Sequence, residues 1–200
     1  MNSSSNNPTT RSPLAMSSQD TAILVVDMQE KLLPSILHQE LVTWNIRRLL
    51  DAASVLNVKM LATEQYPKGL GHTTPVLASY FDSIPEKLAF SCCGVDGLMD
   101  ATKESSIHKV LLVGIEAHVC VQQTALDLMG DGFEVYLAVD AVGSRNGLDK
   151  QIALRRMESS GATLTTVEAA MFEWCQQAGT PEFKQISQLV KETAPTEANE

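Results

Sequence analysis

Two side chains in this sequence stand where catalytic groups are often found, just beyond short apolar runs. Asp27 follows the run at 23–26, and Cys120 follows the run at 110–114 after a short turn. A carboxylate in such a place is either a turn or cap residue or a general base with a tuned pKa. A thiol there is either a small core cysteine or a nucleophile. The residue types alone leave both alternatives open.

The surroundings of Cys120 favour chemistry more specifically. Residues 110–129 predict a strand, a turn and a helix, with the thiol at or near the first helical turn. Unpaired N–H groups and the helix dipole favour a thiolate there, so we expect the pKa of Cys120 to lie below the roughly 8.5 of a free thiol. The same N–H groups are able to receive the oxyanion of an attacked carbonyl. The layout resembles a nucleophile elbow without its Gly-x-Ser-x-Gly pattern.

Other reactive side chains give weaker signals. His118 lies two residues before Cys120 and is expected to line a pocket or face solvent, because neighbours in a turn rarely point at each other. Cys92 and Cys93 are adjacent, which favours ordinary packing over an unstrained disulfide. Lys87, taken alone, has the features of a solvated lysine.

A metal site is not expected. Glu64, Tyr66 and His72 carry side chains that bind metals, but neither a His pair nor a His and carboxylate cluster has a recognised spacing here. We expect no organic cofactor either.

These residues need a scaffold, and the apolar pattern predicts a three-layer α/β fold. The expected strands are short, apolar on both faces and rich in Val, Leu and Ile, at 21–26, 58–63, 110–114, 134–139 and 163–167. Helical patterns lie at 41–56, 119–129, 147–160 and 181–191. Such alternation predicts βαβ units, a parallel sheet and right-handed crossovers. Ligands of open parallel sheets bind at the carboxyl ends of the strands, where Asp27 and Cys120 lie. Residues 64–88 show no clear helix and carry several Pro and Gly, which is typical of a functional segment.

The composition describes one acidic domain. The chain has 200 residues, of which 44% are hydrophobic, enough for a sizeable core. Its 15 basic and 24 acidic residues give a formal net charge of −9, which opposes nucleic-acid binding. Its apolar runs fall short of the roughly 18–20 residues that cross a bilayer. Four cysteines are too few for a disulfide scaffold, so we expect a reducing, cytoplasmic location.

The folded domain is expected to cover residues 21–192. Residues 1–20 are rich in Ser, Asn, Thr and Pro, so we expect a flexible N-terminal tail. This segment lacks the apolar stretch of a secretory signal. It is Ser-rich and acid-poor like a transit peptide, but Arg11 is its single basic residue, which makes mitochondrial targeting the weaker alternative. Residues 193–200 are expected to form an acidic C-terminal tail.

Taken together, the motifs resemble the isochorismatase-like cysteine hydrolase superfamily, which includes nicotinamidases, carbamoyl-amide hydrolases and isochorismatases. The likeness covers roughly residues 21–192 and is greatest to the isochorismatase domain-containing proteins. Its motifs are V-V-D-M-Q-E-K at 25–31, T-E-Q-Y-P-K-G-L-G at 63–71, K-L-A-F-S at 87–91, G-I-E-A-H-V-C at 114–120, D-A-V-G-S-R at 140–145 and R-M-E-S-S-G-A at 156–162.

The resemblance implies a catalytic triad of Asp27, Lys87 and Cys120. It also implies a Rossmann-like six-stranded parallel sheet in the order 3-2-1-4-5-6, with the sixth strand near 88–90. That order places Asp27 and Cys120 together at the switch point of the sheet. The resemblance further implies a cis peptide between Ile115 and Glu116, and an oxyanion hole formed by the N–H groups of Glu116 and Cys120.

The departures from the family pattern narrow the expected reaction. Nicotinamidases carry an Asp-x-His that binds a metal, whereas Glu64-Gln65-Tyr66 stands in the aligned stretch. Isochorismatases that cleave a vinyl ether often lack the nucleophilic cysteine, so the presence of Cys120 favours acyl transfer. We therefore expect hydrolysis of a small amide or related C–N bond through a thioester.

Two alternatives stay open. One is an isochorismate-type ether hydrolase in which Asp27 is the acid, and the other is a non-catalytic, homo-oligomeric interaction module. The expected partners are a small-molecule substrate and further copies of the chain, with neither nucleic acid nor membrane. The natural substrate and the size of the oligomer do not follow from the sequence. The expected pocket walls are Gln29, Tyr66, Leu70, Phe90 and His118.

Overall fold

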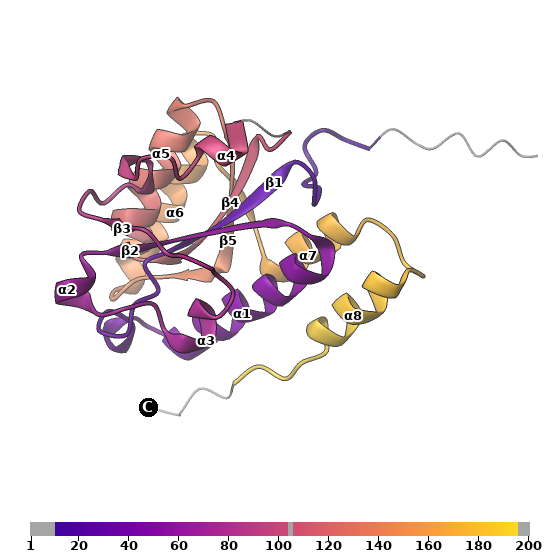
Figure 1. Cartoon of the computed structure of the whole chain (residues 1–200), viewed down its shortest axis with the longest axis horizontal. Coiled ribbons are helices and arrows are strands. Elements are labelled where there is room, and N and C mark those ends of the chain that lie inside the picture. Colours follow the sequence, from indigo (N-terminus) through magenta and orange to yellow (C-terminus); the bar gives the residue numbers. More distant parts are fainter. Residues whose placement is uncertain (1–10, 104–105, 196–200) are drawn as a thin grey trace, which may run out of the picture.

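The chain forms a three-layer α/β/α sandwich around a six-stranded parallel sheet (Figure 1). The computed structural model describes residues 11–103 and 106–195. The sheet order is β3-β2-β1-β4-β5-β6, which confirms the predicted fold class and topology. The strands are β1 (Thr21–Val26), β2 (Lys59–Gln65), β3 (Glu86–Lys87), β4 (Lys109–Ile115), β5 (Glu134–Gly143) and β6 (Thr163–Thr165).

Helices cover both faces of this sheet. On one face lie α1 (Gln39–Leu56) and α7 (Val167–Cys175), with α8 (Pro181–Val190) packed against both. On the other lie α5 (Gln122–Gly130) and α6 (Gly147–Ser159). Short helical turns occupy the connections: η1 (Leu33–Ser35), α2 (Pro67–Leu70), α3 (Pro75–Ala78), η2 (Cys92–Gly94), α4 (Asp100–Lys103) and η3 (Ala117–Val121). Within residues 11–103 and 106–195, every helix is too short or too polar to cross a bilayer.

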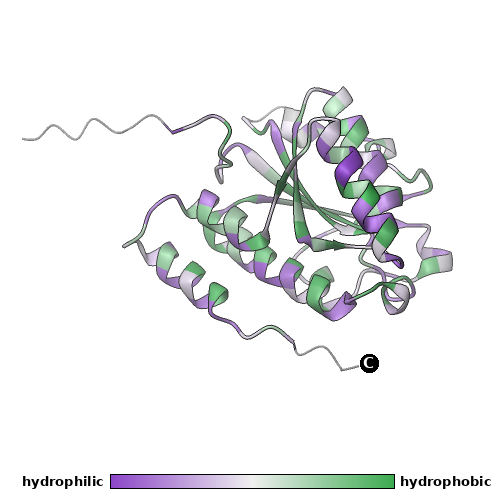
Figure 2. Cartoon of the chain, turned by 180° about the vertical axis from the view of Figure 1, so that it is seen from behind, coloured by the Kyte–Doolittle hydropathy of each residue, from purple (hydrophilic) through white to green (hydrophobic). Residues whose placement is uncertain are grey.

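The hydrophobic core lies on both sides of the sheet because alternate strand residues point to opposite faces. All six residues of β1 are buried. Ile23 and Val25 pack into the cluster beneath α1 and α7, whereas Leu24 and Val26 pack into the cluster beneath α5 and α6. Figure 2 shows the strands coloured mainly as hydrophobic, between helices of mixed colour. The predicted burial on both faces is therefore confirmed for β1 and β4, whereas β6, also expected to be buried, is a partly exposed edge strand.

The edge strands and the helix after β6 differ from the predicted pattern. β3 is Glu86–Lys87 rather than a strand near 88–90, because the N–H groups of Glu64 and Tyr66 donate to the carbonyls of Pro85 and Lys87. β6 ends at Thr165 instead of 167. The hydroxyl of Thr166 caps α7, a helix that the sequence pattern did not predict. The segment 64–88 contains the short helices α2 and α3.

Glycine is required where the end of β4 lies against the end of β1. Gly114 is in register with Val26 and has a φ of +113°, and a Cβ on it would lie 2.2 Å from the Val26 carbonyl oxygen. A side chain at this position is therefore excluded by the backbone of the neighbouring strand. The close approach fixes the end of β1, which leads into Asp27, against the end of β4, which leads into Cys120.

The expected N-terminal tail is wrong for the part that the structure describes. Met16 is completely buried, and its N–H donates to Glu173 Oε2 at 2.7 Å. The buried ammonium of Lys109 donates to the Ala15 carbonyl and to Asp20, both at 2.9 Å. Residues 11–20 thus pack on the domain through backbone and ionic contacts. The low apolar content of this segment does not reveal such contacts. Residues 1–10 and 196–200 of the two expected tails lie outside the described residues.

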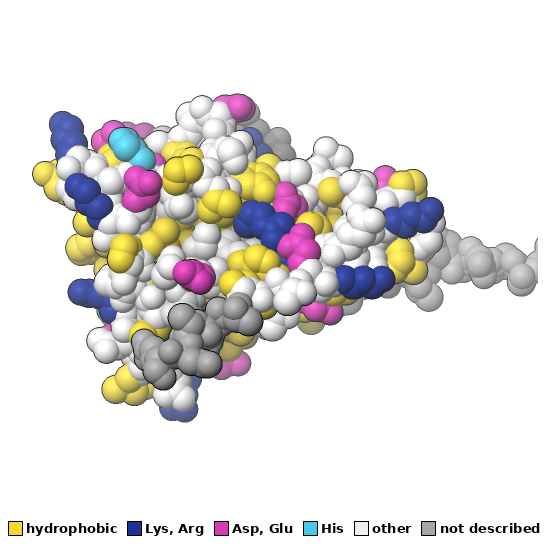
Figure 3. All heavy atoms as spheres, turned by 90° about the horizontal axis from the view of Figure 1, so that it is seen from below, with side chains coloured by type: hydrophobic (Ala, Val, Ile, Leu, Met, Phe, Trp, Pro, Cys, Tyr) yellow, Lys and Arg dark blue, Asp and Glu magenta, His cyan; other side chains and the backbone are white. Residues whose placement is uncertain are grey.

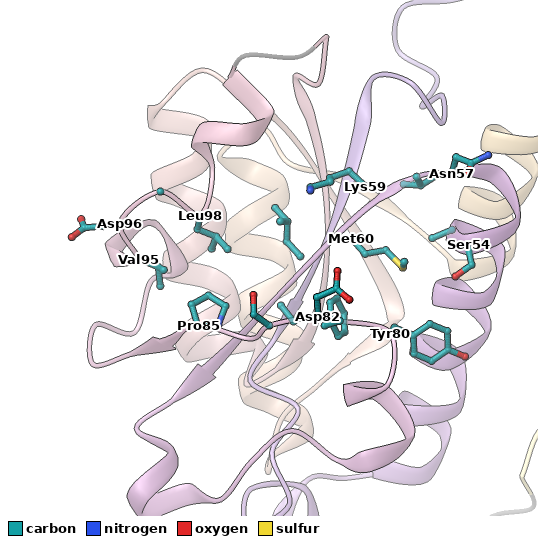
Figure 4. A pocket seen from close by; sticks show the side chains of 17 residues that line it. Ser54, Asn57, Lys59, Met60, Tyr80, Asp82, Pro85, Val95, Asp96 and Leu98 are labelled. Atoms are coloured by element: carbon teal, nitrogen blue, oxygen red, sulfur yellow. The ribbon is translucent and has the colours of Figure 1, made fainter.

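A groove of about 830 Å³ runs beside the amino-terminal half of β2 (Figure 4). Because β3 pairs only with Glu64 and Gln65, the residues from Lys59 to Thr63 form an open sheet edge. The groove is lined by Met60 on β2 and by residues of 80–85 and 95–98. Its lining includes none of the three residues implied as a triad.

Candidate active site

Asp27 stands immediately beyond β1 with its carboxylate completely buried. Its backbone has a φ of 51°, a left-handed conformation that Asp tolerates better than most residues. The hydroxyl of Thr63 donates to Oδ1 at 2.8 Å, and the ammonium of Lys87 donates to Oδ2 at 2.6 Å. Burial raises the pKa of Asp27, while the charge of Lys87 and the hydrogen bonds oppose that rise. The carboxylate is therefore a stronger base than an ordinary aspartate.

Lys87 is buried and fully paired, which differs from the solvated lysine that its sequence context suggested. Its side chain is 1% exposed and lies on β3 at the edge of the sheet. The ammonium donates to Asp27 Oδ2 at 2.6 Å, to Gln65 Oε1 at 2.7 Å and to the Phe90 carbonyl at 2.9 Å. An ammonium has three N–H donors, and these three short contacts use them all. Lys87 therefore acts on its neighbours through charge and position.

Cys120 lies in η3, a single π-helical turn between β4 and α5. Its residue is 6% exposed, and its Sγ lies 4.0 Å from Gln65 Oε1. Burial raises the pKa of this thiol, the negative charge of Asp27 raises it further, and Lys87 opposes both. The expected fall in pKa at a helix N-terminus is thus wrong, because desolvation and the nearby carboxylate outweigh the helix. Burial and the nearby carboxylate thus favour the neutral thiol over the thiolate.

Sequence reasoning missed a second layer of residues around the carboxylate. Thr63 gives its single proton to Asp27, so the contact of 3.3 Å between Thr63 Oγ1 and Cys92 Sγ is donated by the Cys92 thiol. Burial raises the pKa of Cys92 to about 11, consistent with a donor thiol. Gln65 bridges Lys87 and Cys120. The sequence signal that could have identified Thr63 and Gln65 is their polar character at the carboxyl end of the strand β2.

Gln29 was expected in the pocket wall, but it is completely buried, and its side chain hydrogen-bonds to backbone groups. Its Nε2 donates to the carbonyls of Gln65 at 3.0 Å and Gly71 at 2.6 Å, and its Oε1 accepts from the Gln65 N–H at 2.8 Å. The amide has no N–H left for a ligand, since both are donated to backbone. Gln29 thus ties the end of β1 to the end of β2.

The other expected wall residues are more open. Tyr66 is 50% exposed and Phe90 is 52% exposed, and Leu70 is half-buried. His118 is half-buried and contacts Ser144 Oγ through Nδ1 at 3.1 Å. The hydrogen bond of His118 is therefore made to Ser144 and not to Cys120.

The peptide between Ile115 and Glu116 is cis, as the resemblance implied. The Glu116 carboxylate accepts from Nε of Arg145 and from the Arg145 N–H, both at 3.1 Å. The carbonyl of Glu116 accepts from Val119 and Val121. These contacts anchor the backbone that leads from β4 into the turn of Cys120.

The residues considered as metal ligands hold the loop instead. The Glu64 carboxylate accepts from the Thr73 N–H at 2.6 Å and contacts His72 Nδ1 at 3.0 Å. Across residues 11–103 and 106–195, His, Cys, Asp and Glu side chains form no group of three or more suited to a metal ion. The four cysteines, Cys92 and Cys93 included, all lie within the described residues and form no disulfide there.

The arrangement can therefore transfer a proton between a thiol and a buried carboxylate whose position is fixed by an ammonium. Asp27, Lys87 and Cys120 come from three strand ends at one edge of the sheet, on both sides of the switch between β1 and β4. Their convergence brings a thiol, a carboxylate and an ammonium into one site.

Comparison with known proteins gives consistent matches over most of the chain. The Isochorismatase domain model matches residues 21–169. Isochorismatase domain-containing protein 2 of Danio rerio is 38% identical over 186 residues, which cover 90% of this chain and 91% of that protein. The structure of MAR1 ribonuclease from Caenorhabditis elegans has a TM-score of 0.85 at 39% identity, covering 91% of this chain and 95% of that one. The YcaC gene product of Escherichia coli, described as an octameric hydrolase of unknown specificity, has a TM-score of 0.81 at 23% identity, with 90% and 92% covered.

Proposed function

Because the chain belongs to the isochorismatase domain family, we propose that it is a hydrolase that cleaves a small amide or related C–N bond through a thioester on Cys120. The observation that carries the proposal is the ion pair of Lys87 with Asp27 beside the Cys120 thiol. A nucleophile next to a base that is itself held by a third group is the arrangement typical of covalent catalysis.

In the first half of the reaction, Asp27 accepts the thiol proton as the sulfur of Cys120 attacks the carbonyl carbon. The carbonyl oxygen takes the negative charge and accepts from the backbone N–H groups of Glu116 and Cys120. The tetrahedral adduct then collapses, the C–N bond breaks, and the Asp27 carboxyl gives its proton to the departing amine. The thioester is left on Cys120.

In the second half, water replaces the amine. Asp27 takes a proton from the water molecule as the water oxygen attacks the thioester carbon. The C–S bond then breaks, and Asp27 passes the proton to the sulfur. The products are a carboxylic acid and an amine, and the thiol is restored. The raised pKa of Cys120 fits this scheme because the proton leaves only as the sulfur attacks.

The rim of the site favours a small, roughly planar acyl group. Tyr66 and Phe90 each present an aromatic ring that is about half exposed, and Leu70 adds an aliphatic surface. His118 supplies a polar group beside Ser144. The scheme uses only side chains and backbone of this chain, without an organic cofactor or a metal.

Ether hydrolysis is the second candidate reaction, and the raised pKa of Asp27 favours it. A carboxyl group with a raised pKa is suited to donate a proton to a vinyl ether, and this chemistry needs no thiol. A Cys120→Ala variant separates the two reactions, because ether cleavage survives the substitution and amide hydrolysis does not.

RNA is a less favoured substrate, although one similar structure is described as a ribonuclease. The formal net charge is −9, and on the face in Figure 3 Lys and Arg side chains are interspersed with Asp and Glu. Both features oppose binding of a phosphate backbone. Incubation with labelled RNA is expected to give no cleavage that depends on Cys120.

Association of several copies belongs to the proposal. The YcaC protein is described as octameric, and exposed apolar side chains such as Leu88, Leu148 and Ile152 offer surface for association. Analytical ultracentrifugation is expected to show an oligomer. A monomer at micromolar concentration would contradict this part of the proposal.

The reaction is tested by a hydrolysis screen of small aliphatic and aromatic amides and carbamoyl compounds, together with a vinyl ether. We expect amide turnover in the wild-type protein and its loss in Cys120→Ala. Turnover that persists in Cys120→Ala on every substrate found would contradict the thioester. A Cys120 thiol that resists iodoacetamide, in a protein that turns over none of the substrates, would favour a non-catalytic interaction module.

A further inference from the structure

We propose that Gln65 is a positioning residue of this site, whose neutral amide holds the Lys87 ammonium beside Asp27 without adding negative charge near the Cys120 thiol. The inference rests on the proposed function, because it concerns the same reacting groups. It assigns a role to a residue that carries no titratable group.

The orientation of the Gln65 amide follows from its hydrogen bonds. Its Nε2 donates to the carbonyl of Leu88 at 2.9 Å, and a carbonyl oxygen only accepts. The amide oxygen Oε1 must therefore point the other way, toward the Lys87 ammonium at 2.7 Å, which only donates. Both partners require the same orientation of the amide.

The backbone of Gln65 is fixed as firmly as its side chain. Gln65 is in register with Lys87 across β2 and β3. Its N–H and its carbonyl are both bonded to the buried amide of Gln29. Gln65 is itself 8% exposed, so the amide oxygen reaches Lys87 from a clamped strand end.

Two requirements meet at this amide oxygen. The Lys87 ammonium needs a third close acceptor besides Asp27 and the Phe90 carbonyl, because the Ala89 carbonyl lies 3.4 Å away and a poorly paired buried N–H is costly. The same oxygen lies 4.0 Å from Cys120 Sγ. A carboxylate here would satisfy Lys87, but its charge at about 4 Å would change the thiolate population by roughly a thousandfold at an effective dielectric constant near 20.

A carboxylate would also compete with Asp27 for the single ammonium. Asp27 would then lose part of the positive charge that keeps it ionised, so its pKa would rise and a smaller fraction of it would be ionised and ready to accept the thiol proton. An apolar side chain would spare the thiol but leave one N–H of Lys87 with only the Ala89 carbonyl, at 3.4 Å, as its acceptor. A neutral acceptor meets both requirements, and Gln65 supplies one.

The test compares Gln65→Glu and Gln65→Met with Gln123→Glu, which adds the same charge on an exposed position of α5. The readout is the rate at which iodoacetamide alkylates Cys120, measured on the Cys120 peptide by mass spectrometry from pH 7 up to the highest pH at which the protein stays folded. Because the pKa of Cys120 is raised, most of these rates lie below the midpoint, where a tenfold change in rate corresponds to a midpoint shift of about one pH unit. In Gln65→Glu we expect the midpoint of the rate to move to higher pH and the rate at pH 8 to fall at least about tenfold, since one pKa unit is tenfold in thiolate. In Gln123→Glu the midpoint stays at the wild-type value.

Gln65→Met serves as the second variant and carries no new charge. We expect it to alkylate with a midpoint no higher than wild type, but to hydrolyse the amides found above at least about tenfold more slowly per folded molecule. Circular dichroism measures the folded fraction. Unchanged hydrolysis in Gln65→Met would overturn the inference, as would a Gln65→Glu midpoint equal to that of Gln123→Glu.

Asp27→Asn distinguishes failure of this inference from failure of the proposed function. If Asp27→Asn lowers the alkylation midpoint and Gln65→Glu leaves it unchanged, the role of Gln65 is wrong and the coupling of Asp27 to Cys120 stands. If neither variant moves the midpoint, the proposed function fails together with the inference.

Discussion

The ammonium of Lys87 lies 2.6 Å from the carboxylate of Asp27, and both side chains are buried, at 1% and 0% exposure. Removing two charges from water is expensive, and their attraction compensates only when the remaining donors and acceptors are also satisfied. Here Thr63, Gln65 and the Phe90 carbonyl complete the hydrogen bonds. The pair is therefore buried with its hydrogen bonds satisfied, close to the Cys120 thiol.

Breaking this pair from the lysine side should cost stability. Lys87→Met leaves the Asp27 carboxylate buried without its counter-ion, and we expect the free energy of unfolding at pH 7 to fall by about 3–5 kcal/mol. Urea denaturation measures the loss. Lys68→Met is the matched control, because Lys68 is exposed on α2, and a surface substitution of this kind is usually worth within about 0.5 kcal/mol. Equal midpoints for the two variants would contradict the paired arrangement.

The pH dependence of hydrolysis should report the raised pKa of Asp27. The base must be ionised to accept the thiol proton, so the rate falls as pH drops through that pKa. Because burial places the Asp27 pKa above the ordinary 3.8, the acid limb is expected at higher pH than for a solvated aspartate. Lys87 lowers the same pKa, so any folded Lys87→Met protein should show its acid limb at still higher pH. An acid limb that stays in place would argue against Asp27 as the base.

The fold was largely predictable because strands that are buried on both faces leave a continuous apolar run, as β1 does. The two-residue strand β3 leaves no such run. α7 was missed although Val167, Ala170, Met171 and Trp174 follow helical spacing, because the first of these residues was read as the end of a strand. Short pairings depend on the neighbouring strand rather than on their own sequence.

The candidate site was predictable only in part. Asp27 and Cys120 were found from the residues because each follows an apolar run, whereas Lys87 was implied by the family resemblance alone. The direction of the Cys120 pKa was wrong, because a sequence does not give the burial of the sulfur or its closeness to a carboxylate. Gln65 was missed because a neutral amide gives no signal until its partners are known.

The close approach of β1 and β4 predicts a severe effect of a single methyl group. Gly114→Ala would place a Cβ 2.2 Å from the Val26 carbonyl oxygen, so the strands must separate at the point where they carry Asp27 and Cys120. We expect loss of folded protein, or a folded protein with at least about tenfold slower hydrolysis. Gly147→Ala is the control, because a Cβ on Gly147 meets nothing within 4 Å. Two variants with equal melting temperature and activity would refute this account of the switch point.

The packing of residues 11–20 predicts that a residue ahead of β1 contributes to stability. Met16→Ala removes a completely buried side chain, and we expect the free energy of unfolding to fall by about 2–5 kcal/mol. Leu14→Ala, at a side chain that is 76% exposed, should be close to neutral. Chemical denaturation of the two variants measures the difference. If both unfold like wild type, this segment is a tail after all.

We expect the buried Cys120 thiol to become a nucleophile because Asp27 and Lys87 lie beside it. Intact-protein mass spectrometry during turnover of an amide, followed by peptide mapping, tests it most directly. We expect one acyl group per chain, located on Cys120, in the wild-type protein, and its absence in Cys120→Ser and Asp27→Asn. Hydrolysis without an acyl group on Cys120, or acylation that persists in Asp27→Asn at the wild-type rate, would contradict the claim.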